Sequence, residues 1–333
     1  MKPTIICLTP VRNEAWILDR FLKAASLWAD YIIIADQMST DGSREIAQKY
    51  SKVILIDNPS ETFNEPDRQK LLITEARKIT GPRLLITLDA DEMFTPNLLI
   101  SIEWKNMLRA NPGTIFKFQW ANFRQDFKSM WFGYYFPWGY MDDGFEHNEH
   151  KLIHTGRIPL PLGHEEITIN EIKVIHFQFT VWERMKSKHR FYQCFEVLNF
   201  PGKSAVDIFR QYHHMLAIPK EQIIQIPEDW IRKYNELGID ITTSQFEPFN
   251  WFDDQILKMM EQYGSLIFKQ IAIWDVDWVE QAKLLGKKNL EQFKNPGTRI
   301  DRLIQGWLFK TQSKVNKRIY KRIDKIIKIL FHY

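Results

Sequence analysis

Acidic side chains follow three short apolar segments in the first third of the sequence. Residues 4–9 lead into Pro10-Val-Arg-Asn-Glu14, residues 31–35 lead into Asp36 and a polar run ending at Ser43, and residues 83–88 lead into Asp89-Ala-Asp-Glu92. Ligands of parallel α/β sheets bind beyond the carboxyl ends of the strands, so these residues are expected to converge on one site. Carboxylates gathered there would suit a divalent cation and, through it, a diphosphate.

Asp89 and Asp91 are the pair best suited to a metal. Mg²⁺ is usually held by one or two carboxylates together with phosphate oxygens, so the pair predicts a metal-bridged diphosphate leaving group. The first loop contains no glycine, which excludes the Gly-rich pyrophosphate cradle of dinucleotide enzymes. The same Asp-x-Asp pattern recurs at Asp275 and Asp277, and we interpret that second copy as structural.

Two hydrophobic periodicities alternate around these loops. Apolar runs predict buried strands at residues 4–9, 31–35, 53–56 and 83–88. Apolar side chains spaced by three and four residues predict helices between them, and Thr95 and Pro96 begin another helix. This alternation predicts an α/β fold with a mostly parallel central sheet that helices cover on both faces.

The three loops together resemble a known enzyme family. Pro10-x-Arg-Asn-Glu14, Asp36-x-x-Ser-x-Asp-Gly-Ser43 and Asp89-x-Asp-Glu92 are similar to the family 2 glycosyltransferases with the GT-A fold, notably bacterial surface-polysaccharide and lipopolysaccharide transferases. The resemblance spans about residues 4–110. It implies a nucleotide-sugar donor, preferably a UDP-sugar, a Mn²⁺ or Mg²⁺ ion, and transfer to an acceptor hydroxyl with inversion.

The resemblance also implies roles for individual residues. The nucleotide would be bound by Pro10, Arg12, Glu14, Asp36, Asp41, Arg68 and Asp89. Asp36 would contact the base, and Asp91 would bind the metal together with Asp89. Gln37 and Met38 replace the small polar pair that usually follows the first aspartate, which leaves the identity of the base open.

An inverting transfer also needs a carboxylate that accepts the proton of the acceptor hydroxyl. Leu162-Gly-His-Glu-Glu166 and the later Val174-Ile-His-Phe177 resemble a His-Glu element and a strand-borne histidine of surface-polysaccharide transferases. The similarity implies Glu165 or Glu166 as the base and His176 as a metal ligand. A solvated glutamate pair and a core histidine are the structural alternatives. The Gln-x-x-Arg-Trp motif of processive synthases is absent, which favours addition of a single sugar.

Thirteen aromatic residues lie between Phe116 and Phe145. Aromatic faces stack on sugar rings, and the Gly and Pro residues between them indicate loops. We interpret Trp131 and Trp138 as part of a wall that binds the acceptor. The alternative is that these aromatics fill the flank of the sheet.

The charge of the chain is unevenly distributed. The whole sequence has 45 Lys and Arg against 41 Asp and Glu, whereas residues 298–333 hold ten of the basic and two of the acidic residues. Apolar residues recur there at helical spacing, which predicts one amphipathic helix of up to about 30 residues, kinked near Gly306. A basic helix of this kind suits an anionic membrane surface. Docking on the acidic body and formation of a homodimer are the alternatives.

These observations predict a four-part chain. The parts are a nucleotide-sugar-binding half (1–115), an acceptor and catalytic half (116–215), a helical extension (216–297) and the basic helix (298–333). Two cysteines and no apolar run of about 18 residues favour a cytoplasmic protein at the inner face of the cell membrane. A folded nucleic-acid-binding domain is disfavoured, because the body is acidic.

The predicted function is metal-dependent transfer of one sugar to a glycan or lipid-linked acceptor in cell-surface polysaccharide synthesis. The alternative is an inactive GT-A-like scaffold that binds glycan or a partner transferase. A haloacid-dehalogenase-like phosphatase would have Thr or Val where this chain has Met93, and a sugar-nucleotide pyrophosphorylase would have a Gly-rich first loop.

Overall fold

The computed structural model describes residues 2–245 and 250–333, which form two compact units. The first unit contains residues 2–181 and 224–245, and the second contains residues 182–223 and 250–333. This division differs from the predicted one. Residues 182–215, which we expected in the acceptor half, belong to the second unit.

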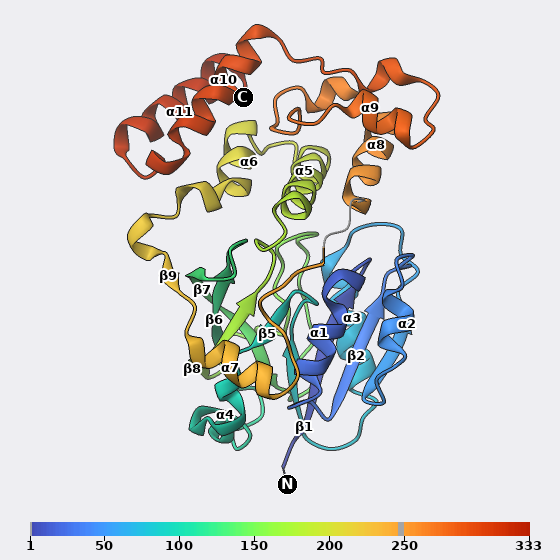
Figure 1. Cartoon of the computed structure of the whole chain (residues 1–333), viewed down its shortest axis with the longest axis vertical. Coiled ribbons are helices and arrows are strands. Elements are labelled where there is room, and N and C mark those ends of the chain that lie inside the picture. Colours follow the sequence, from blue (N-terminus) through green and yellow to red (C-terminus); the bar gives the residue numbers. More distant parts are fainter. Residues whose placement is uncertain (1, 246–249) are drawn as a thin grey trace. The chain divides into compact units, whose positions relative to one another are not determined.

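Four parallel strands form the first part of a mixed sheet (Figure 1). They are β1 (Thr4–Val11), β2 (Tyr31–Asp36), β3 (Val53–Asp57) and β4 (Arg83–Thr87), in the order β3-β2-β1-β4. All four predicted strands are present. Their carboxyl ends meet at one edge of the sheet, because β1 pairs in parallel with both β2 and β4.

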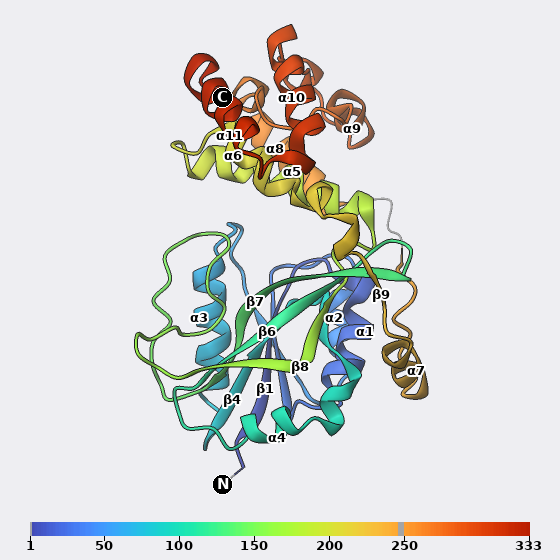
Figure 2. The same ribbon diagram turned by 90° about the vertical axis from the view of Figure 1, so that its left-hand side faces the viewer.

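Helices cover both faces of these strands, as predicted. Helix α1 (Ala15–Ala25) packs with Ile5 and Cys7 of β1 on one face, and α3 (Glu65–Ala76) packs with Ile6 and Leu8 on the other. Figure 2 shows α1 and α3 on opposite sides of the sheet. The short helix α2 (Ser43–Ala47) lies next to α1 and contributes Ala47 to the same core.

The remaining strands make the sheet more antiparallel than we predicted. They are β5 (Glu92–Phe94), β6 (Ile115–Phe123), β7 (Ser129–Met141), β8 (Glu166–His176) and β9 (Ile224–Gln225). The sheet continues from β4 as β7-β6-β8-β5. Strand β7 is antiparallel to both β4 and β6, whereas β6 and β8 are parallel. The aromatic segment predicted as loops therefore forms two long strands.

A β-bulge explains how β7 tolerates its proline. Phe116 pairs with Gly139 and Lys117 with Pro137, so Trp138 is the extra residue in β7. Proline is accommodated in strands at such interruptions of the ladder. Short helices complete the unit: η1 (Pro96–Ile100), α4 (Ile102–Met107) and α7 (Glu228–Glu236).

The second unit is helical. Its longer helices are α5 (Trp182–Asn199), α6 (Ala205–Tyr212), α8 (Trp251–Tyr263), α9 (Trp278–Leu284), α10 (Arg299–Thr311) and α11 (Arg318–Phe331). The prediction of a single basic helix kinked near Gly306 was wrong, because the chain turns after Thr311 and two helices result. Arg210 of α6 donates to the Leu308 carbonyl at 2.8 Å and to Thr311 Oγ1 at 2.8 Å, which fixes the end of α10.

The second Asp-x-Asp copy is structural, as we interpreted it. Asp277 is the N-cap of α9 and accepts hydrogen bonds from the Val279 and Glu280 amides at 3.1 Å each. Asp275 accepts two hydrogen bonds from Arg190, at 2.8 and 2.7 Å. Both carboxylates thus fix the fold of the helical unit.

Candidate nucleotide and metal site

Hydrogen bonds join the loops that follow β1 and β2. The Asn13 amide donates to Ser39 Oγ at 2.9 Å, and the Thr40 amide donates to Asn13 Oδ1 at 2.8 Å. Asp41 accepts from the Ala15 amide at 2.9 Å, at the first residue of α1. The predicted nucleotide residue Asp41 therefore has a structural role, because its carboxylate joins the two loops.

Asp36 lies at the end of β2 and is 1% exposed. Its Oδ2 atom accepts from Arg44 Nη1 at 2.8 Å and from the Ser39 amide at 3.2 Å. Its Oδ1 atom is buried and has no hydrogen-bond partner within the described part of the chain. A buried acceptor without a partner is costly, so this atom suits a ligand N–H donor such as that of a nucleobase.

Other predicted nucleotide residues lie around this edge. Pro10 pairs with Ala35, directly before Asp36, and Glu14 accepts a hydrogen bond from Trp16 Nε1 at 2.7 Å. Arg12 is half-buried in the loop after β1.

Arg68 of α3 has a guanidinium nitrogen, Nε, that could donate a hydrogen bond to a ligand. Its guanidinium lies 5.4 Å from the centre of the Phe63 ring and 4.0 Å from Glu65 Oε1. Among the described residues, its buried Nε atom has no hydrogen-bond partner.

Asp91 and His176 are brought together by strand pairing. Glu92 of β5 pairs with His176 of β8, so Asp91 directly precedes the paired position. The distance between Asp91 Oδ2 and His176 Nε2 is 3.9 Å, and both side chains are nearly buried. His176 Nδ1 lies 2.8 Å from Asn122 Oδ1, which orients the imidazole ring.

Asp89 and Glu92 share a positive partner, Arg157. The arginine donates to Asp89 Oδ2 at 2.6 Å and to Glu92 Oε2 at 2.5 Å, and Trp120 Nε1 donates to Glu92 Oε1 at 2.8 Å. Burial raises the pKa of Glu92 to about 7; Arg157 opposes this change, and Asp89 and Asp91 add to it. Burial lowers the pKa of Arg157, but the charges of Asp89 and Glu92 outweigh burial and raise it above its ordinary value.

The donor atoms of Asp91 and His176 fit a divalent cation that takes its other ligands from phosphate and water. Asp91 and His176 could contribute one oxygen and one nitrogen, while Asp89 is held by Arg157. Within the described ranges, no group of three or more His, Cys, Asp or Glu side chains is arranged to hold a metal. Mg²⁺ typically takes only one or two protein carboxylates and completes its shell with phosphate and water.

The sequence match gives the family of this site. Residues 6–155 match the family model described as Glycosyl transferase family 2. This part of the chain belongs to glycosyl transferase family 2. The matched residues include most of β1, all of β2–β4, and Asp36, Asp89 and Asp91, and the mixed α/β architecture is consistent with a GT-A fold.

Solved structures share low identity with the chain. TarS of S. aureus is 10% identical, with a TM-score of 0.36 over 94% of this chain and 55% of TarS. The 4-diphosphocytidyl-2C-methyl-D-erythritol synthase of Anaerococcus prevotii DSM 20548 is 17% identical, with a TM-score of 0.27 over 42% of this chain and 70% of that one. No curated protein matches the chain. The family assignment therefore rests on the sequence match.

The predicted catalytic bases of this glycosyltransferase domain lie at the wrong end of the sheet. Glu166 pairs with Ile115 at the start of β6, whereas His176 pairs with Asn122. These positions are about 23 Å apart along β6 at roughly 3.3 Å per residue. Glu166 forms an ion pair with Lys117. The prediction of Glu165 or Glu166 as the base does not fit this arrangement.

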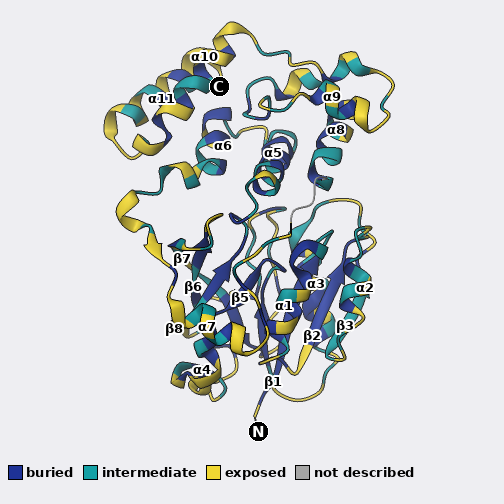
Figure 3. Cartoon of the chain, viewed as in Figure 1, coloured by how far each residue is buried: buried dark blue, intermediate teal, exposed yellow. Residues whose placement is uncertain are grey.

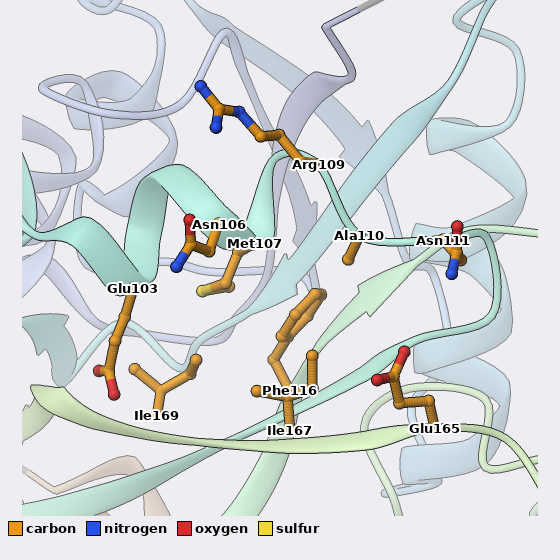
Figure 4. Close-up of a pocket in the computed structure, with 10 residues that line it drawn as sticks. All are labelled: Glu103, Asn106, Met107, Arg109, Ala110, Asn111, Phe116, Glu165, Ile167 and Ile169. Carbon is orange, nitrogen blue, oxygen red and sulfur yellow. The ribbon is translucent and has the colours of Figure 1, made fainter.

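Glu165 instead lines a pocket of 310 Å³ (Figure 4). Its carboxylate accepts a hydrogen bond from Thr114 Oγ1 at 3.3 Å. Glu103 lies at the opposite end of the same pocket, whose apolar lining includes Phe116 and Ile167. Asp91 and His176 do not line this pocket.

The two predicted acceptor tryptophans are buried. Trp131 packs against Phe179, with ring centroids 4.8 Å apart, and Trp138 packs against Trp120 at 5.1 Å. Their exposed fractions are 6% and 2%, so neither offers a ring face to a sugar. The exposed aromatic side chains of β7 are Phe132, Tyr134 and Tyr135. Trp131 and Trp138 therefore belong to the hydrophobic core, and the prediction that they bind the acceptor does not fit their burial.

Sequence reasoning missed two residues of the acidic site. Glu92 follows Asp91 in the recognised motif, but no role was assigned to it. Arg157 is about 70 residues away in sequence and lies in a segment without a regular pattern. Its only sequence signal is that a buried acidic cluster needs a compensating cation.

Proposed function

We propose that the chain is an inverting glycosyltransferase that moves one sugar from a nucleotide diphosphate donor, preferably a UDP-sugar, to a glycan or lipid-linked hydroxyl. The observation that carries this proposal is the convergence of Asp36, Asp89 and Asp91 at the carboxyl ends of β2 and β4. The family match over residues 6–155 supports a glycosyltransferase activity.

The donor would lie across the joined loops of β1 and β2. The Oδ1 atom of Asp36 would accept an N–H of the base, and Arg44 keeps that carboxylate oriented. Arg68 would donate to the diphosphate through its Nε atom. Asp89 would face the ribose, on the side of its carboxylate that Arg157 leaves open.

A divalent cation would be held by Asp91 with His176 beside it, and when bound it would neutralise the charge of the departing diphosphate. The chain contributes a site from which water is largely excluded, since both side chains are nearly buried. Asn122 fixes the imidazole so that Nε2 faces Asp91. These residues would thus hold the cation that neutralises the leaving group.

Nucleotide binding tests the proposal. We expect UDP to raise the melting temperature of the chain only when Mn²⁺ is present. GDP, CDP and dTDP should raise the melting temperature less than UDP does. Replacement of Asp36 with Asn should weaken the UDP effect about tenfold, because a charge-assisted hydrogen bond is lost. Stabilisation by none of the four nucleotides would favour the inactive scaffold instead.

The basic C-terminal helices α10 and α11 have an exposed surface that would suit membrane binding. The membrane would carry the lipid-linked acceptor. Along the described residues, no helix has the length and hydrophobicity to cross a bilayer. On α11, Ile319, Ile326 and Leu330 share one helical face and are 62%, 51% and 67% exposed. The exposed Arg318 and Arg322 lie beside this face. Figure 3 shows exposed residues recurring along α10 and α11.

An apolar strip bordered by arginine and lysine is the pattern by which peripheral helices bind anionic lipid. Each nearby cation contributes about 1 kcal/mol to such binding. We propose that residues 298–333 bind the chain to an anionic membrane surface, at the inner face of the cell membrane. The bound chain would meet a lipid-linked acceptor there.

Serine at positions 319, 326 and 330 tests this association. The combined I319S, I326S and L330S variant should co-sediment at least about tenfold less with phosphatidylglycerol vesicles, because three inserted apolar side chains are lost. Leu284→Ser is the control, since Leu284 is 71% exposed in the same unit but outside the basic helices. Equal co-sedimentation of the triple variant and wild type would contradict membrane binding. A dimer lost in the triple variant would favour the dimer alternative.

A further inference from the structure

The guanidinium group of Arg157 lies inside the acidic site. It donates to Asp89 at 2.6 Å and to both oxygens of Glu92, at 2.5 and 3.2 Å. The centre of the Trp138 ring lies 5.6 Å from the guanidinium carbon. One cation thus holds two of the three carboxylates that follow β4.

The loop that carries Arg157 is fixed from several directions. The Thr155 amide donates to Glu65 Oε2 at 3.0 Å, and the Glu65 amide donates to the Leu152 carbonyl at 3.0 Å. His147 Nε2 lies 2.7 Å from the Gly156 carbonyl. Because the loop is tied to the first turn of α3, the position of the guanidinium is preorganised.

Carboxylates outnumber their arginine partners in this site. Asp89 and Asp91 act electrostatically on Glu92, and Asp89 also acts on Glu65, so the four carboxylates form one cluster. Arg157 and Arg68 supply two positive charges.

We propose that Arg157 is a positioning residue that holds Asp89 and Glu92 away from metal, so that the site binds a single divalent cation at Asp91. This inference rests on the proposed function and adds to it the means by which the number of metal ions is set. Without Arg157, Asp89 and Glu92 would lose their cationic partner, and although Glu92 keeps the hydrogen bond from Trp120 Nε1, both carboxylates would be open to a cation next to Asp91. The site then attracts Mn²⁺ strongly even when no diphosphate is present.

Titration with Mn²⁺ alone tests the proposal, with free Mn²⁺ measured by electron paramagnetic resonance. Arg157→Gln should bind Mn²⁺ at least tenfold more tightly than wild type. The matched control is Arg77→Gln, which removes the same charge from an ion pair with the buried Asp142, at 2.8 Å. Asp142 follows β7 beside the start of β4, at the other end of the sheet. The control should bind Mn²⁺ as wild type does.

A Mn²⁺ affinity of Arg157→Gln equal to that of wild type, or equally raised in both variants, would overturn the proposal. Arg157→Lys gives a second test, because it keeps the positive charge at this position. Its ammonium cannot make the two-sided contact of a guanidinium, so about threefold tighter Mn²⁺ binding is expected. Wild-type affinity in this variant would also contradict the proposal. No nucleotide is present in these titrations, so failure of the proposed function would be detected separately, by the nucleotide melting experiment.

Discussion

Replacing Asp91 with Asn is expected to reduce sugar transfer at least about 100-fold while leaving the first unit folded. Asparagine keeps the shape of the side chain but removes the negative charge that would hold the cation. The loss should appear in kcat as well as in kcat/KM, because the interaction matters most when charge develops on the leaving diphosphate. The donor sugar hydrolysed or transferred per minute, measured with each nucleotide sugar, gives the comparison.

The second Asp-x-Asp copy provides the matched control for this experiment. Asp277→Asn makes the same chemical change in the same sequence pattern, and asparagine caps helices about as well as aspartate. Its activity should stay within twofold of wild type. The Mn²⁺ dependence of stabilisation by UDP should be lost in Asp91→Asn and kept in Asp277→Asn. Full activity of Asp91→Asn would overturn the assignment of Asp91 to the metal.

The nucleotide half of the site could be predicted because its signals are local in sequence. Four apolar runs between helices predict a parallel sheet, and the residues directly after each run then share one edge. Asp36 lies at the end of β2, and Asp89 and Asp91 both follow β4, so no knowledge of distant packing was needed to bring them together.

The other half could not be predicted in the same way, because its geometry depends on strand direction. Glu166 and His176 begin and end the same strand, and their partners in β6 are about 23 Å apart at roughly 3.3 Å per residue. A continuous strand between them would have excluded a shared site, but the sequence was interpreted as two separate elements. Arg157 has no local pattern at all, and its role follows only from the packing of the loop before β8 against Glu65 and Asp89.

A buried ion pair joins two helices of the helical unit. Arg210 of α6 pairs with Asp324 of α11 through two hydrogen bonds of 2.9 Å, and the two side chains are 11% and 9% exposed. The same guanidinium donates to Gln312 Oε1 at 3.0 Å. Together with its bonds to the end of α10, these contacts fasten both basic helices to α6.

Arg210→Ala is therefore expected to destabilise α10 and α11 by about 3–5 kcal/mol, because it leaves Asp324 buried without its partner. Hydrogen exchange of the amides in residues 299–331 should accelerate strongly, while exchange in β1 and β2 stays unchanged. Lys258→Ala is the control, since Lys258 makes a 2.7 Å ion pair with Asp254 but is 57% exposed in the same unit. Solvent-exposed pairs of this kind contribute little, so exchange in the control should match wild type.

The paired variant Arg210→Met with Asp324→Leu separates the two contributions to this effect. If the cost of Arg210→Ala comes mainly from an uncompensated buried charge, the paired variant should recover much of the lost stability, since replacing a buried ion pair by apolar side chains is often neutral. If the cost comes instead from the contacts with Leu308, Thr311 and Gln312, the end of α10 should exchange rapidly in both variants. Slow exchange throughout 299–331 in Arg210→Ala would show that the packing of Ile304, Leu308 and Ile327 alone holds the basic helices in place.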